Sequence, residues 1–246
     1  MSINPSSWLR PPAPSSPARP SPVPARLREW ILAGDAAAVR YSARPGAVLG
    51  WLLAANVVLA TVGVAAGSLA GDPALYFREL MPGTWLSAGH ILAAAVTARA
   101  IHRRDPRGRR WYESFWGLSA VLLAGLAVVE LTQPTVFLSK WLQNDAGLRA
   151  PSAIVDLDGM MMAFVLGAVA VILAARALEV LRHPRALGLF AAAAALGAVS
   201  QFIDATSRVS TWEFVVEDGV KALAGPFLVA GYLVVLRSVA RRQSTD

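Results

Sequence analysis

Six long apolar runs constrain this chain more than any other feature of its sequence. Each run is close to the roughly 20 residues that a helix needs to cross the hydrocarbon layer of a membrane. Because lipid offers backbone groups no hydrogen-bond partners, such runs predict membrane-spanning helices. We expect an all-α fold, a polytopic six-helix transmembrane bundle. Its predicted helices lie at about 46–70, 84–101, 114–133, 154–179, 186–204 and 216–237.

The composition agrees with a chain that folds in lipid. Hydrophobic residues make up 55% of the 246 residues and charged residues only 16%, against about 25% charged residues in soluble domains. The formal net charge is +7, but the bases lie between apolar runs instead of on one folded face, so no nucleic-acid partner is predicted. The chain has no cysteine, which excludes disulfides, thiolate metal sites and cysteine nucleophiles.

The N-terminal region differs from the rest of the chain. Eight prolines occur within the first 24 residues, a composition that favours extended, solvated chain and predicts a disordered tail. The following segment has the pattern of an interfacial amphipathic helix lying on the bilayer, with Gly34 and Asp35 as its least typical residues. The predicted segments are a cytoplasmic tail at 1–24, the interfacial helix at 25–45, the transmembrane domain at 46–237 and a short basic cytoplasmic tail at 238–246.

The arginines alternate along the chain. They gather in the N-terminal region, in the second and fourth connections and at the C-terminus, whereas the first, third and fifth connections are rich in acids. By the positive-inside rule, this pattern places both termini in the cytoplasm and the odd-numbered connections outside.

Ionisable residues from several predicted helices share one depth near the outer side. Charges at the edge of a hydrocarbon layer are expected to face each other, a partner helix or a water-filled cavity. The stretch 202–225 is especially rich in them. The candidates for a polar pocket are His90, Glu130, Asp156, Asp158, Asp204, Glu217, Asp218 and Lys221.

A simpler interpretation explains part of this group. Acids are stabilised at helix N-termini, and Glu217 and Asp218 have the spacing to pair with Lys221 on the same helix. Glu130 is different, because it lies near a helix C-terminus after two apolar turns. It therefore needs a partner, for which Lys221 and His90 are the two candidates.

No spacing in the sequence identifies a metal or a cofactor. One histidine with several carboxylates is a poor zinc set, and no calcium-loop pattern accompanies the acids. Haem would need a second axial ligand at the depth of His90, and Lys221 lies too shallow for a retinal Schiff base.

Two features concern the packing and shape of the helices, and a third, Asn56, could add hydrogen bonds to the polar pocket. Gly63 and Gly67 have the small-xxx-small spacing of close helix contacts. Pro226 removes a backbone donor inside the last run, which predicts a loosened or kinked helix. Asn56 places an amide in the middle of the first run.

Two stretches carry a family resemblance: FWGLSAVLLAGLAVVELTQ at 115–133 and VVEDGVKALAGPFLVAGYL at 215–233. Together they resemble a loose group of uncharacterised bacterial multi-pass membrane proteins, in which one helix ends in an acidic motif and the last opens with paired acids ahead of a glycine. The group often has a histidine–glutamate pair after the first acid, where this chain has Thr132 and Gln133. The resemblance implies an inner-membrane location and names no activity.

Three functions remain open from the sequence. The first is an outward-facing acidic pocket that binds a cation, a proton or a polar lipid group. The second is a structural or regulatory subunit of a larger membrane complex, with a membrane-protein partner or a second copy of the chain bound in the bilayer. The third is an intramembrane hydrolase, for which no nucleophile pair is evident.

Overall fold

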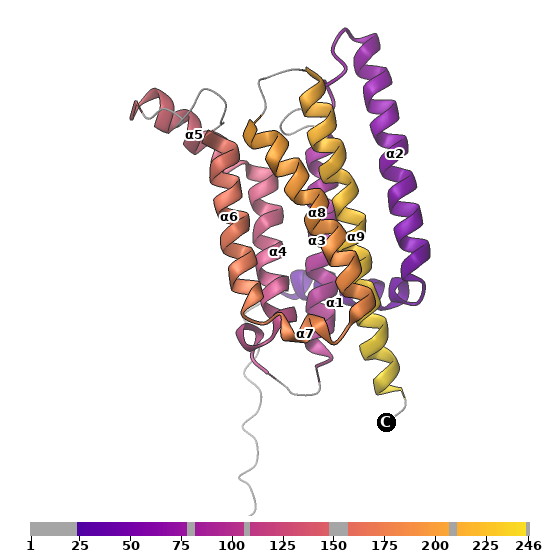
Figure 1. Ribbon diagram of the computed structural model, residues 1–246. Helices are drawn as coiled ribbons and strands as arrows, with labels where there is room; N and C mark the ends of the chain where they lie inside the picture. The colour runs from indigo at the N-terminus through magenta and orange to yellow at the C-terminus, as the bar shows by residue number, and fades with distance from the viewer. Residues whose placement is uncertain (1–23, 78–81, 106–108, 148–156, 207–210, 245–246) are drawn as a thin grey trace, which may run out of the picture.

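The computed structural model describes residues 24–77, 82–105, 109–147, 157–206 and 211–244. All regular elements within these ranges are helical (Figure 1). The N-terminal residues 1–23 and the candidate Asp156 lie outside the described residues. The elements are α1 (Ala25–Ser42), α2 (Pro45–Leu69), α3 (Pro82–Arg103), η2 (Trp111–Glu113), α4 (Phe115–Thr132), α5 (Pro134–Asn144), α6 (Leu157–Ala174), α7 (Leu178–Leu181), α8 (Pro184–Thr206) and α9 (Thr211–Gln243).

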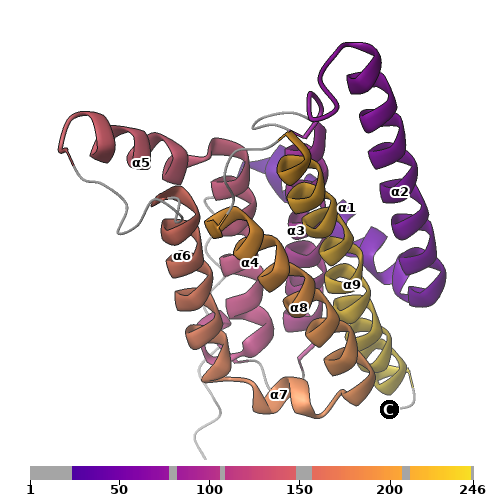
Figure 2. The same ribbon diagram turned by 45° about the horizontal axis from the view of Figure 1, so that its top comes forward.

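Five of these helices are long and apolar enough to cross a membrane, namely α2, α4, α6, α8 and α9. The run predicted at 84–101 forms α3, but this helix is not in that set. Its buried surface includes polar residues, among them Thr84, His90 and Thr97. These lower its hydropathy, and they can be accommodated because α3 lies in the middle of the bundle, packed against α4, α9 and α1 (Figures 1 and 2).

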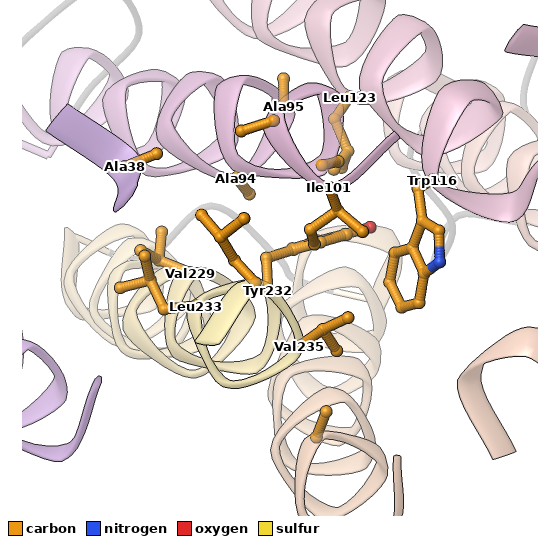
Figure 3. Close-up of a cluster of buried hydrophobic side chains, with 14 of the residues drawn as sticks. Ala38, Ala94, Ala95, Ile101, Trp116, Leu123, Val229, Tyr232, Leu233 and Val235 are labelled. Carbon is orange, nitrogen blue, oxygen red and sulfur yellow. The ribbon is translucent and has the colours of Figure 1, made fainter. Parts of the chain in front are cut away.

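The apolar core lies between α3, α4, α8 and α9. Alanines of α3, including Ala94 and Ala98, are fully buried and let α9 approach closely. Tyr232 of α9 fills the space beside them, with its ring edge-on to Trp116 and to Phe190 at centroid distances of 6.0 and 4.9 Å. Figure 3 shows this cluster, in which alanine, branched aliphatic and aromatic side chains from helices distant in sequence meet.

Gly63 and Gly67 of α2 pack against the segment that follows their own helix. A Cβ at Gly63 would lie 3.3 Å from the Phe77 ring, and one at Gly67 would collide with the backbone of Asp72. Their spacing therefore serves the turn after α2, whereas the sequence suggested a contact with another helix.

A hydrogen bond from Asn56 replaces the backbone donor that Pro226 lacks. Proline has no N–H, so Pro226 leaves the carbonyl of Ala222, four residues earlier, without its helical donor. The Asn56 side chain, only 3% exposed, donates from Nδ2 to that carbonyl at 2.6 Å. Helix α9 runs through Pro226 without ending, and the same bond fixes α2 to α9.

α1 is held to the C-terminal half of α3 by the two residues that suit an interfacial helix least. A Cβ at Gly34 would lie 3.1 Å from the Val96 side chain, which shows how closely the helices approach. The buried Asp35 accepts from Arg103 at 2.7 Å and from Arg99 at 3.4 Å. Gly34 and Asp35 therefore fix α1 to the bundle.

Replacing Asn56 tests the bond to Ala222. We expect Asn56→Leu to lower the free energy of unfolding by about 1 kcal/mol, the size of interhelical hydrogen bonds in membranes. In a Pro226→Ala background residue 226 supplies its own N–H to Ala222, so the effect of Asn56→Leu should shrink. Unfolding in mixed micelles with increasing dodecyl sulfate measures both values.

Thr61→Val is the matched control, because the exposed Thr61 hydroxyl donates to the carbonyl of Val57 within the same helix. If Asn56→Leu lowered the free energy of unfolding equally with Pro226 present and in the Pro226→Ala background, Asn56 would not be replacing the donor that Pro226 lacks.

Candidate functional site

The predicted site residues within the described ranges lie mainly at one end of the bundle, which we call the acidic end. There Glu130 lies in the last turn of α4, Asp158 in the first turn of α6 and Asp204 in the last turn of α8. The first turns of α9 add Glu217, Asp218 and Lys221. The up-and-down path of the chain brings these ends together at the top of the bundle in Figure 1.

A cavity of about 370 Å³ opens among these helix ends. We call it the acidic cavity. Its polar wall contains Thr84, Ser87, Glu130, Gln133, Asp158, Gln201, Asp204, Glu217, Asp218 and Lys221. Its apolar wall contains Ile91, Leu123, Leu126, Met162, Leu166, Phe190, Ala193 and Leu228, among others. The charged groups lie toward helix ends, whereas the apolar residues Ile91, Leu123 and Leu166 lie in helix interiors, so the deeper part of the cavity is apolar.

An ion pair between α4 and α9 crosses the polar wall. Lys221 Nζ lies 2.9 Å from Glu130 Oε1, and Glu130 is only 8% exposed. Glu130 needs a positively charged partner because the C-terminal end of a helix disfavours a negative charge. Lys221 is that partner. The side chain of Lys221 keeps a third of its surface exposed, so the pair lies at the edge of the cavity.

Asp218 lies between Lys221 and the start of α3. Its Oδ1 is 4.0 Å from Lys221 Nζ, and a Cβ at Gly83 would lie 3.2 Å from its Oδ2. Gly83 belongs to the first turn of α3, where the helix dipole stabilises a negative charge. Asp218 therefore has two sources of positive potential.

Asp204 is positioned by its own helix and by α6. Gln201, one turn earlier on α8, donates from Nε2 to Asp204 Oδ2 at 2.9 Å and to the carbonyl of Gly159 at 3.1 Å. Gly159 follows Asp158 in the first turn of α6. One amide thus connects the two helix ends that carry Asp158 and Asp204.

His90 is placed differently from the other candidates. Its ring is buried and packs against Gly225 of α9, where a Cβ would lie 2.6 Å from the ring. Among the described residues, no side chain or backbone group forms a hydrogen bond with its Nδ1. His90 is not among the residues that line the acidic cavity, so its role there is packing between α3 and α9.

Two parts of the cavity wall were not evident in the sequence. Gln201 was not singled out, although its position three residues before Asp204 was a usable signal. Helix α5 was also missed, and its first residues Thr135 and Val136 line the cavity. Gln133 adopts the left-handed conformation with φ of 46°, which ends α4 and starts α5 at Pro134. A proline directly after the third run could have indicated this break.

The carboxylates of the wall come from four helices, α4, α6, α8 and α9. Within the parts of the chain that the structure describes, no three His, Asp or Glu side chains are close enough to hold a metal ion. Comparison of the chain with protein-family models, curated proteins and solved structures finds no match. The chemistry of the cavity is therefore inferred from its own residues.

Breaking the Glu130–Lys221 pair should destabilise the protein. Glu130→Gln leaves the Lys221 charge without its nearest partner, and we expect a loss of about 1–3 kcal/mol, less than for a fully buried pair because Lys221 is partly exposed. The double variant Glu130→Gln/Lys221→Met should regain part of this loss. Denaturation in mixed micelles measures the effects.

Glu29→Gln on the exposed face of α1 is the control for removing one carboxylate. If Glu130→Gln were as stable as Glu29→Gln, the pair would not contribute as described.

Proposed function

We propose that this is a multi-pass inner-membrane protein in which α3 is the sixth spanning helix and both termini lie in the cytoplasm. At 1.5 Å per residue, the 22 residues of α3 give a length of roughly 33 Å, enough to cross the hydrocarbon layer. Arginines such as Arg104, Arg182 and Arg241 lie at the end of the bundle opposite the acidic cavity. The positive-inside rule then directs the acidic cavity outward.

We propose further that the acidic cavity binds the positively charged group of a small amphiphilic molecule. The observation that carries this proposal is the composition of the wall: among the described residues, five carboxylates and one ammonium line the cavity. The carboxylates come from α4, α6, α8 and α9, and ionisable groups at the edge of a hydrocarbon layer are expected to face one another or a polar cavity. A wall rich in carboxylates suits a cationic ligand.

The apolar depth of the cavity favours an organic cation over a bare ion. Ligand pockets of this kind have volumes of about 300–1,000 Å³ and combine apolar walls with a few polar groups that orient the ligand. The acidic cavity has a volume of about 370 Å³, and residues such as Leu126 and Phe190 would contact an alkyl or ring portion. Among the described residues no three acids are placed to hold a metal ion, whereas an alkylammonium group needs no fixed coordination geometry.

The residues of the wall would have distinct roles. Lys221 holds Glu130 and lies near Asp218, so it organises the α4–α9 side of the cavity. Asp204, oriented by Gln201, faces the cavity from α8. A cation between Asp204 and Asp218 would then join α8 to α9 across the mouth.

Binding of decyltrimethylammonium, used below its micellar concentration, tests the proposal. We expect saturable stabilisation of the full-length protein in neutral detergent, about 2.7 kcal/mol at 100 times the dissociation constant. Decyl maltoside, which has the same tail and no charge, should not produce it. Asp204→Asn and Asp218→Asn should each weaken binding about tenfold, which corresponds to about 1.4 kcal/mol.

The matched control is Asp145→Asn, which removes an exposed carboxylate at the end of α5, outside the cavity lining. Equal affinity in Asp145→Asn, Asp204→Asn and Asp218→Asn would refute the proposed site. Native mass spectrometry of the gently solubilised protein provides the second readout. A stoichiometric protein partner with no bound small molecule would favour the accessory-subunit function instead.

A further inference from the structure

A second cavity, of about 610 Å³, lies at the opposite end of the bundle from the acidic cavity. We call it the basic cavity. It is formed by the corner between α7 and α8, the last turns of α9 and the first residue of α2, Pro45. Five of its lining residues are arginines: Arg182, Arg185, Arg237, Arg241 and Arg242. The described residues that line it include no aspartate or glutamate.

The start of α8 adds further positive potential to this cavity. The first N–H groups of a helix have no acceptor within the helix, and the helix dipole makes this end positive. Arg185 and Ala186 lie in that first turn and line the cavity, and the turn contains no acid. An arginine is normally unfavourable at this position, so its placement there favours an anion between the helix end and the side chains.

His183 shows how closely the positive groups gather. Burial lowers the pKa of His183, and the charges of Arg242 and Arg182 lower it further. Ser238 of α9 lies 3.2 Å from His183 Nδ1, which joins the α7–α8 corner to α9. Because the lowered pKa keeps the imidazole neutral at pH 7, the charge of the cavity comes from its arginines.

Arg109, nearby at the same end, has a different environment. Its guanidinium contacts Asp105 at 2.7 Å and Glu179 at 2.6 Å, and these acids raise its pKa. The basic cavity, in contrast, is lined by arginines from two segments about 50 residues apart along the sequence. The positive-inside rule requires only that bases lie on one side of the membrane. It does not require that they line one cavity.

We propose that the basic cavity binds a phosphate group, and that an anionic phospholipid is its natural source. Guanidinium groups bind phosphate oxygens through paired hydrogen bonds, and a helix N-terminus supplies backbone donors to the same anion. Three candidate membrane-spanning helices, α2, α8 and α9, contribute to the cavity near their ends. The cavity is therefore at the level of lipid headgroups, where basic pockets between helices hold anionic lipids.

Titration of the full-length protein in neutral detergent with three probes tests this inference by native mass spectrometry and thermal unfolding. The probes are phosphatidylglycerol, inorganic phosphate and diacylglycerol, which lacks the phosphate. We expect phosphatidylglycerol to bind saturably and diacylglycerol not to bind. The variant Arg182→Gln/Arg185→Gln should bind phosphatidylglycerol about tenfold or more weakly, since charge-assisted hydrogen bonds are the strong ones.

Two further variants separate phosphate binding from a general effect of charge or folding. Arg26→Gln/Arg28→Gln removes the same number of charges from the exposed face of α1 and should bind like the unmodified protein. Arg185→Lys keeps the positive charge but loses the paired N–H donors of the guanidinium group. It should therefore recover part of the phosphatidylglycerol affinity that is lost in Arg185→Gln. If Arg182→Gln/Arg185→Gln does not fold, Arg237→Gln/Arg241→Gln replaces it on the opposite wall.

Each outcome decides between the alternatives. Binding of inorganic phosphate but not phosphatidylglycerol, with the same dependence on the arginines, supports the phosphate site and identifies a soluble source. Equal binding of phosphatidylglycerol to Arg182→Gln/Arg185→Gln and Arg26→Gln/Arg28→Gln overturns the site. Failure of both phosphate probes to bind, or equal binding of diacylglycerol, overturns it as well.

Discussion

Several buried polar groups of this apolar bundle find their partners on other helices, and these contacts organise the structure. Glu130 meets Lys221, the Asn56 amide meets the carbonyl that Pro226 leaves open, and Asp35 meets two arginines of α3. Each of these contacts joins two different elements. These polar contacts therefore specify which helices are neighbours, while the apolar majority of the sequence makes five of the described helices long and apolar enough to cross a membrane.

The same constraint explains the central position of α3. This helix carries buried threonines, a serine and His90 along an alanine-rich surface, so contact with lipid would be more costly for it than for α2 or α6. Packing α3 against α4, α9 and α1 covers these groups with protein. It also brings Thr84 and Ser87 to the acidic cavity, so the helix least suited to lipid forms part of the candidate site.

The helices were largely predictable from the sequence, and their neighbours were not. Apolar length located α2, α3, α4, α6, α8 and α9 to within a few residues at most ends, because the bilayer imposes that length. Depth along a helix follows from counting residues, which explains why Glu130, Asp204 and Asp218 could be assigned to one end. Adjacency depends on contacts between distant segments, so the sequence left both Lys221 and His90 open as partners of Glu130. Helix α5 was missed because its start depends on the left-handed Gln133, which a hydropathy pattern does not report.

The central claim is that charged residues of α4 and α9 meet inside the bundle at the acidic end. Cross-linking tests it most directly, because the chain has no cysteine of its own and introduced pairs can be read without background. In native membranes, a short bis-methanethiosulfonate reagent should join E130C to K221C, whose native side chains are in contact. It should not join E130C to R242C at the opposite end. Equal cross-linking of the two pairs, or none at E130C/K221C, would contradict the proposed arrangement of α4 and α9.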